Sequence, residues 1–136
     1  MIVVDTDVIA AFWIRGPRTP AALGARRRDP DWAAPVLWRS EFRSVLRQYM
    51  LAGHIGYSDA VWIADKAEAS MRGKEYTVAT ASVLKLVERT GHSSYDCEFV
   101  ALADAMGLHL VTGDGKIARV FPDVAVSLEE FATIEK

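Results

Sequence analysis

The sequence is poor in cysteine and contains no long hydrophobic run. Its one cysteine, Cys97, excludes a disulfide within the chain and a cysteine-rich metal site, as is usual for proteins of the reducing cytoplasm. No uninterrupted apolar stretch approaches the length of a membrane span, and the chain does not open with a basic segment followed by a long apolar one. We therefore expect a cytoplasmic protein that is neither secreted nor bound to a membrane.

The sequence also lacks a strong excess of either charge, an internal repeat and any low-complexity segment. Its 16 basic and 18 acidic residues give a formal net charge of −2, which does not suggest a protein that coats nucleic acid. Clustered carboxylates and arginines can still lie on different surfaces, so net charge alone excludes no partner. With 136 residues, of which 51% are hydrophobic, we expect a single domain spanning residues 1–136.

An apolar run near the start of the chain ends in two carboxylates. Ile2, Val3 and Val4 are typical of a strand buried on both faces, as in a parallel sheet covered by helices. Asp5 then follows the carboxyl end of the strand, where open α/β sheets bind ligands. Alternatively, Asp5 or Asp7 caps the helix that begins next, because aspartate is a preferred N-cap residue. This stretch alone supports both interpretations.

Strand-like and helix-like segments alternate along the rest of the chain. Pro35 indicates that the second strand lies at an edge or begins after the proline, and Ser40 is a candidate N-cap. Alternation with short connections predicts an α/β fold with a mostly parallel sheet. The further strands are expected at residues 32–37, 74–78, 108–111 and 124–126, and the helices at residues 8–14, 20–28, 40–53, 58–71, 82–89 and 95–106, with a tail or helical turn at 128–134.

Four acidic residues occupy equivalent topological positions. Asp5 and Asp114 follow strands, while Glu41 and Asp96 open helices that follow a strand or its equivalent, so all four are expected at the carboxyl edge of the sheet. Grouped carboxylates repel one another, which is unfavourable unless a cation neutralises them. Oxygen ligands without histidine or cysteine suit Mg²⁺ or Mn²⁺. We infer phosphoryl transfer in which the metal orients a water molecule.

The acids belong to four segments that occur in a recognisable order. These are residues 3–8 (VVDTDV), 40–46 (SEFRSVL), 95–103 (YDCEFVALA) and 110–116 (LVTGDGK), which together span nearly the whole chain. No single segment is specific, whereas the ordered set is hard to obtain by chance. On these segments the sequence resembles the PIN-domain ribonucleases, and among them the VapC-type toxins of toxin–antitoxin pairs.

The resemblance implies a three-layer α/β/α fold with a central, mostly parallel sheet, and endonucleolytic cutting of RNA in the cytoplasm with Mg²⁺ or Mn²⁺. It also implies a homodimer and a small antitoxin protein that blocks the acidic site, often with a basic side chain. Asp7 departs from the family, which often has serine or asparagine there, so we expect it to cap the helix or support the site. By motif position, the catalytic and metal-holding quartet would be Asp5, Glu41, Asp96 and Asp114, supported by Thr6, Asp7 and Thr112.

Two other functions fit parts of the pattern. Haloacid-dehalogenase-like phosphatases also begin with an apolar strand and Asp-x-Asp, with the first aspartate, here Asp5, as nucleophile. Their later motif normally continues to another acid, where this chain has Ala118, and the phosphatase interpretation leaves Glu41 and Asp96 without a role. The other alternative is a non-catalytic PIN-like module that binds RNA or a partner, against which the intact quartet argues. For RNA contact, the basic candidates are Arg39, Arg43 and Lys116.

Overall fold

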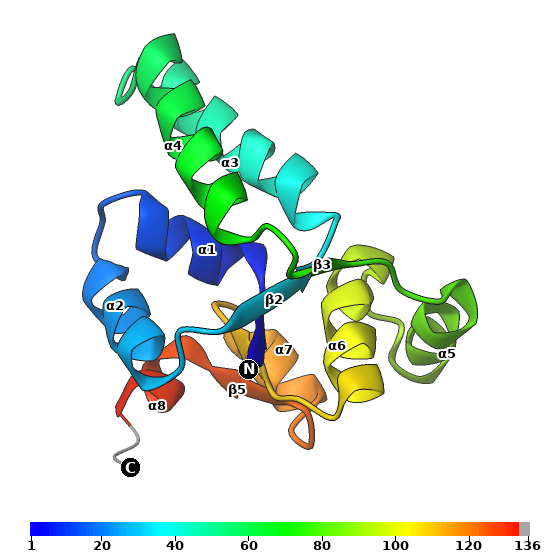
Figure 1. Cartoon of the computed structure of the whole chain (residues 1–136). Coiled ribbons are helices and arrows are strands. Elements are labelled where there is room, and N and C mark those ends of the chain that lie inside the picture. The colour runs from blue at the N-terminus through cyan, green and yellow to red at the C-terminus, as the bar shows by residue number, and fades with distance from the viewer. Residues whose placement is uncertain (134–136) are drawn as a thin grey trace.

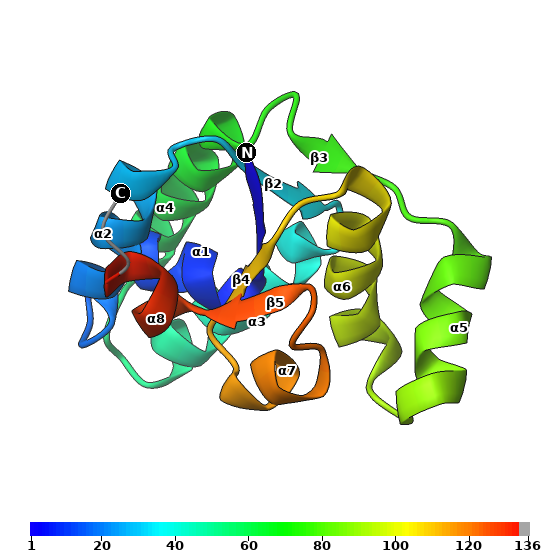
Figure 2. The same ribbon diagram turned by 90° about the horizontal axis from the view of Figure 1, so that it is seen from below.

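The computed structural model describes residues 1–133 and contains a five-stranded sheet in the order β3-β2-β1-β4-β5. All four neighbouring pairs are parallel, so the α/β class with a parallel sheet is confirmed. Helices cover both faces of this sheet, which gives three layers (Figure 2). The strands are β1 (Ile2–Val4), β2 (Trp32–Pro35), β3 (Glu75–Tyr76), β4 (Leu110–Thr112) and β5 (Ala125–Ser127).

Helices connect the strands, and two of them form an arm that projects from the body of the molecule. In Figure 1 the arm consists of α3 and α4, which lie side by side above α1. None of the helices within residues 1–133 is both long and apolar enough to span a bilayer. The helices are α1 (Thr6–Trp13), α2 (Thr19–Arg28), α3 (Trp38–Leu51), α4 (Tyr57–Ser70), α5 (Thr80–Thr90), α6 (Ser94–Met106), α7 (Gly115–Val120) and α8 (Leu128–Thr133).

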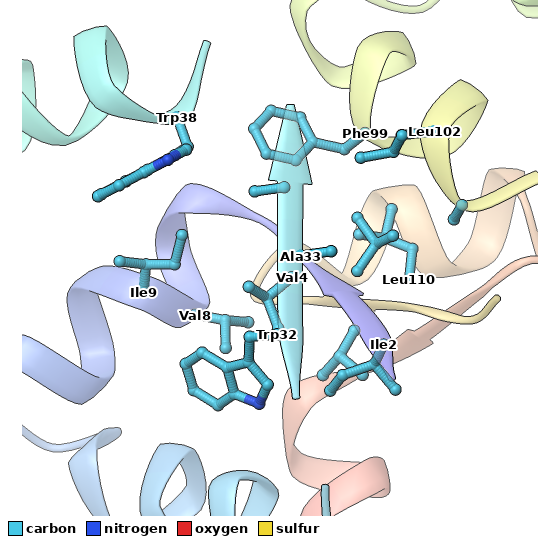
Figure 3. Close-up of a cluster of buried hydrophobic side chains, with 14 of the residues drawn as sticks. Ile2, Val4, Val8, Ile9, Trp32, Ala33, Trp38, Phe99, Leu102 and Leu110 are labelled. Carbon is cyan, nitrogen blue, oxygen red and sulfur yellow. The ribbon is translucent and has the colours of Figure 1, made fainter. Parts of the chain in front are cut away.

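The first strand lies at the centre of the sheet and is buried on both faces, as its β-branched residues predict. Val3 aligns with Ala33 of β2 on one side and with Leu110 of β4 on the other, and all three are fully buried. Figure 3 shows Ile9 and Trp38 packed on one side of β2, with Phe99 on the other. This packing fixes the carboxyl end of β1, where Asp5 begins α1, relative to the neighbouring strands.

Two local predictions need correction. β2 lies between β1 and β3, so Pro35 is not at an edge; the pairing with β1 involves Trp32 and Ala33, so the proline follows it and interrupts no bond to β1. The helix expected to begin after Ser40 begins two residues earlier, at Trp38, so Ser40 does not cap it. The predicted C-terminal turn is helix α8, and its last expected residue, 134, lies outside the described part of the chain.

Candidate active site

A cleft at the carboxyl ends of β1 and β4 gathers the predicted acids. The volume of the cleft is about 350 Å³, and hydroxyl and apolar side chains complete its walls. Because β1 and β4 are neighbouring parallel strands, residues that follow them reach the same edge of the sheet. The acids that line the cleft are Asp5, Asp7, Glu41, Asp96 and Asp114, together with Thr6 and Ser44.

Asp5 is the most firmly held of these acids. Its carboxylate is buried and caps α1, because the backbone N–H of Val8 donates to Oδ1 at 3.1 Å. The hydroxyl of Thr112 donates to Oδ2, and the backbone N–H of Gly113 contacts both oxygens at 3.2 and 3.1 Å. Asp5 therefore both caps α1 and forms part of the site. The expectation that Asp7 caps this helix is wrong, since Asp7 lies one residue inside it.

Burial leaves Asp5 with an unusual acidity. Its pKa rises from 3.8 to about 7, chiefly because the carboxylate has lost its contact with water. Repulsion from Asp7 acts in the same direction, while the hydrogen bonds from Thr112, Val8 and Gly113 oppose the rise. The surrounding donors hold the carboxylate in place but do not supply a countercharge.

Glu41 and Asp96 enter the cleft from the first turns of α3 and α6. The hydroxyl of Thr6 donates to Glu41 Oε1 at 2.6 Å, so Thr6 is bonded to one acid of the quartet. Loss of hydration raises the pKa of Glu41, and Asp96 and Asp7 repel its charge. Loss of hydration likewise raises the pKa of Asp96, with His92, whose Nε2 lies 3.5 Å from Asp96 Oδ2, opposing the rise. No pattern in the sequence assigns His92 to the site.

Asp114 is held by its own helix and by Thr112. It caps α7 by accepting a hydrogen bond from the backbone N–H of Lys116 at 2.9 Å. Its own backbone N–H donates to the Thr112 hydroxyl at 2.9 Å, and that hydroxyl in turn donates to Asp5. Thr112 thereby links the acids that follow β1 and β4, the two neighbouring strands at the centre of the site.

Arg18 supports the same loop from outside the cleft. Its Nη1 donates to the Gly113 carbonyl at 2.9 Å, and its Nε and Nη2 donate to the two carboxylate oxygens of Glu129 at 3.1 and 3.0 Å. A Cβ added to Gly113 would lie 2.4 Å from the Cβ of Asp7, so Asp7 packs directly against this loop. The sequence contains no signal for this arrangement, because Arg18 and Glu129 are 111 residues apart.

The chemistry of the cleft suits a hard divalent cation. Among the described residues that line it, the polar side chains are carboxylates and hydroxyls, without histidine, cysteine, lysine or arginine. Burial is the main reason that the pKa values of Asp5, Glu41 and Asp96 are raised, so ionisation of these carboxyl groups is unfavourable in the cleft and would be favoured by a bound cation. Within residues 1–133, no three His, Cys, Asp or Glu side chains form a ready-made metal cage. The donor types therefore fit Mg²⁺ or Mn²⁺.

The basic residues singled out in the sequence differ in their surroundings. Arg39 donates to both oxygens of Glu75, at 2.6 and 2.7 Å, and to Glu68 at 3.0 Å, so its guanidinium joins α3 to β3 and α4. Arg43 has an exposed side chain 3.8 Å from Glu68. Lys116 is also exposed and lies two residues from Asp114. Only the latter two present their charge to an approaching polyanion.

Comparison with known proteins agrees with this α/β architecture. The sequence profile of the PIN domain matches residues 2–121, so the chain belongs to the PIN-domain family, whose members are typically nucleases. The structure is similar to the crystal structure of PAE2754 from Pyrobaculum aerophilum, with a TM-score of 0.77 and 20% sequence identity over 96% of this chain and 92% of that one. No match is found among the curated proteins. The structural likeness supports the fold, and the profile supports the family.

Proposed function

We propose that this protein is a metal-dependent endoribonuclease that hydrolyses RNA phosphodiester bonds. The observation that carries the proposal is that Asp5, Glu41, Asp96 and Asp114 line one cleft at the carboxyl edge of the sheet. Three of these carboxylates have raised pKa values, a condition that a bound cation would relieve. Divalent metals are usual in PIN-domain nucleases, and we propose Mg²⁺ or Mn²⁺ here.

The side chains of the cleft would have different roles in such a site. Asp5, Glu41, Asp96 and Asp114 would hold the ion, which when bound lowers the pKa of a water molecule and stabilises negative charge on the phosphate. Thr112 and Gly113 fix the Asp5 carboxylate, and Thr6 fixes one oxygen of Glu41. Lys116, exposed beside Asp114, is placed to attract a phosphate of the strand.

The phosphatase alternative fits the contacts of Asp5 less well. A nucleophilic aspartate needs an oxygen that the substrate can approach, whereas Asp5 is only 6% exposed and accepts hydrogen bonds on both oxygens. Burial also keeps its pKa near neutrality, so much of the carboxyl group is protonated at pH 7 without a cation. A covalent aspartyl-phosphate on Asp5 would restore the phosphatase and refute the nuclease.

We further propose that the protein is a toxin of a type II toxin–antitoxin pair, active as a homodimer in the cytoplasm. Support comes from the resemblance of its four acidic segments to VapC-type toxins and from the uncompensated charge of the cleft. An antitoxin with a basic side chain would fit such a cleft by charge complementarity. A small DNA-binding protein encoded next to this chain would support the assignment, and co-purification of the two would test it directly.

The decisive experiment is cleavage mapping of total RNA with Mn²⁺ or Mg²⁺, and with EDTA as the metal-free control. Asp5→Asn and Asp96→Asn should each lower the rate by at least about 100-fold. Asp104→Asn, which changes an exposed acid farther along α6, should cut like the wild type. Mn²⁺ should also raise the melting temperature of the wild type and not of Asp5→Asn. Cutting that survives both cleft substitutions would overturn the mechanism.

A further inference from the structure

We propose that unpaired bases of the substrate strand stack in a groove that adjoins the acidic cleft, an inference that rests on the proposed ribonuclease function. The residues that line the groove come from the C-terminal end of α1, the loop that follows, and the arm of α3 and α4, and Figure 1 shows where these elements lie in the fold. Its volume is about 640 Å³, larger than that of the acidic cleft. We call it the aromatic groove, after Trp13, Tyr49, His54 and Trp62 in its lining.

The aromatic groove is continuous with the acidic cleft. A small hollow between them is lined by Asp7 and Val45, which also line the cleft, and by Ile14 and Tyr49, which also line the groove. A strand whose scissile phosphate lies among the acids can therefore continue along α1 without leaving the surface. This continuity identifies the substrate itself as the occupant, because a ligand of the groove must lie next to a ligand of the cleft.

The side chains of the groove suit bases that are free of pairing. Trp62 is 60% exposed, although a large aromatic residue on a helix would normally be covered. Tyr49 and His54 lie edge to face, with ring centroids 6.1 Å apart. Exposed and half-exposed rings stack on nucleotide bases, which offer a free face only where the strand is unpaired. Single-stranded RNA is therefore the class of ligand that the groove fits.

Positive charge accompanies these rings. The Lys66 ammonium lies over the Trp62 ring, 5.5 Å from its centroid, and the exposed Arg15 lines the groove beside α1. Asp59, also in the lining, is an opposing charge. When the bases of a strand stack on these rings, its phosphates face outward, where nearby cations can bind them. The acids of the cleft supply no such attraction, so the groove provides affinity that the catalytic centre lacks.

The test measures binding of fluorescently labelled single-stranded RNA in EDTA, which removes divalent metal and so prevents the proposed cleavage during the measurement. Trp62→Leu should weaken binding of an oligonucleotide of about ten residues roughly tenfold, the effect of one lost stacking contact. Tyr57→Leu is the matched control, because Tyr57 is 75% exposed on the same helix but lines a different hollow. Trp62→Phe, which keeps an aromatic face, should recover most of the affinity. A blunt RNA duplex should bind equally to the wild type and Trp62→Leu.

The outcomes separate this inference from the proposed function. Trp62-dependent binding without any cutting would keep the groove and refute the ribonuclease. Cutting by a protein whose affinity for RNA is the same with Trp62→Leu would keep the ribonuclease and refute the groove, leaving its aromatic surface to a polypeptide partner. Equal losses in Trp62→Leu and Tyr57→Leu would also overturn the proposal, because they would indicate a general effect of exposed rings on α4.

Discussion

Carboxylates in two regions of this molecule have pKa values shifted in opposite directions. At the base of the arm, Glu75 meets Arg39 and the indole N–H of Trp38, and the Arg39 hydrogen bonds are the main reason that its pKa is lowered. In the acidic cleft, burial raises the pKa of Asp5 to about 7, and the residues that hold it are neutral donors. Glu75 is thus kept ionised by a cation beside it, whereas ionisation of Asp5 is made unfavourable by burial among neutral groups.

This difference distinguishes the acids that stabilise the fold from the acids that form the site. The carboxylates at the base of the arm have a countercharge in the chain, and their ion pairs join α3, α4 and β3. The acids of the cleft have lost hydration and repel one another, and His92 beside Asp96 and Arg18 near Asp7 offset this only in part, so their arrangement lowers stability. A protein retains such a cluster where function requires it. Changes on either side of this contrast should therefore act in opposite directions.

The largest effect on stability should come from the charge of Asp5. The folded carboxyl group binds a proton between pH 3.8 and about 7, where the unfolded one does not. Stability of the metal-free protein should therefore fall as pH rises through this window, by roughly 4 kcal/mol in all. Asp5→Asn, which keeps an oxygen acceptor without the charge, should flatten the dependence and be more stable than the wild type at pH 8.

Urea unfolding in EDTA at several pH values measures this contribution. Other groups titrate as well, so the informative quantity is the difference between wild type and Asp5→Asn at each pH. Asp104→Asn, an exposed change on α6, should follow the wild type throughout. Parallel curves for wild type and Asp5→Asn would show that ionising Asp5 does not destabilise the fold. This result would contradict the proposed difference between the two regions.

A methyl group at Gly113 tests how tightly the acids are held. The added Cβ would lie 2.4 Å from the Cβ of Asp7, so the loop that donates to Asp5 must shift. Gly113→Ala should lower stability by about 2 kcal/mol and cleavage about 100-fold. Gly115→Ala is the control, because its Cβ would meet only the flexible end of Arg119 at 3.4 Å. Equal activity of the two variants would contradict the tight packing inferred for this loop.

Removing the countercharge at the base of the arm should act on stability alone. Arg39→Met leaves the mostly buried Glu75 carboxylate, 14% exposed, without its cation. We expect a loss of about 1–2 kcal/mol by urea unfolding. The affinity of the cleft for Mn²⁺ should not change, as calorimetry can verify. Arg43→Met, at a 61% exposed position 3.8 Å from Glu68, should have almost no effect. A change in Mn²⁺ affinity with Arg39→Met would show that the two regions are coupled.

Most elements and the four acids were predictable because they follow from local pattern, whereas helix α7 was not predicted. Three β-branched residues predicted a buried strand, and the rule that parallel strands end at one edge predicted that Asp5, Glu41, Asp96 and Asp114 would meet there. The exact helix starts were not, since α3 begins at Trp38 without a side-chain cap. Packing of the Trp38 ring in the core outweighs the local preference of Ser40 for an N-cap position.

The partners of the charged residues could not be predicted, because they come from distant parts of the chain. The sequence suggested Arg39 as a candidate for RNA contact, yet its carboxylate partner is 36 residues away on β3. Capping and site formation were treated as alternatives for Asp5, whereas the folded chain uses its two oxygens for both. Pairings of this kind depend on which elements become neighbours, and sequence periodicity does not contain that information.

Arg18 provides the smallest and finest test of the contrast, because it is a cation placed beside the cleft but outside it. Its exposed ion pair with Glu129 contributes little to stability, so Arg18→Gln should change the free energy of unfolding by less than about 1 kcal/mol. Losing the bond to the Gly113 carbonyl should instead lower kcat about threefold, because Asp114 follows directly on that loop. Glu129→Gln, which leaves that bond in place, should lower kcat less. If both variants kept the wild-type kcat, the acids would be positioned by the sheet and the Thr112 bonds alone.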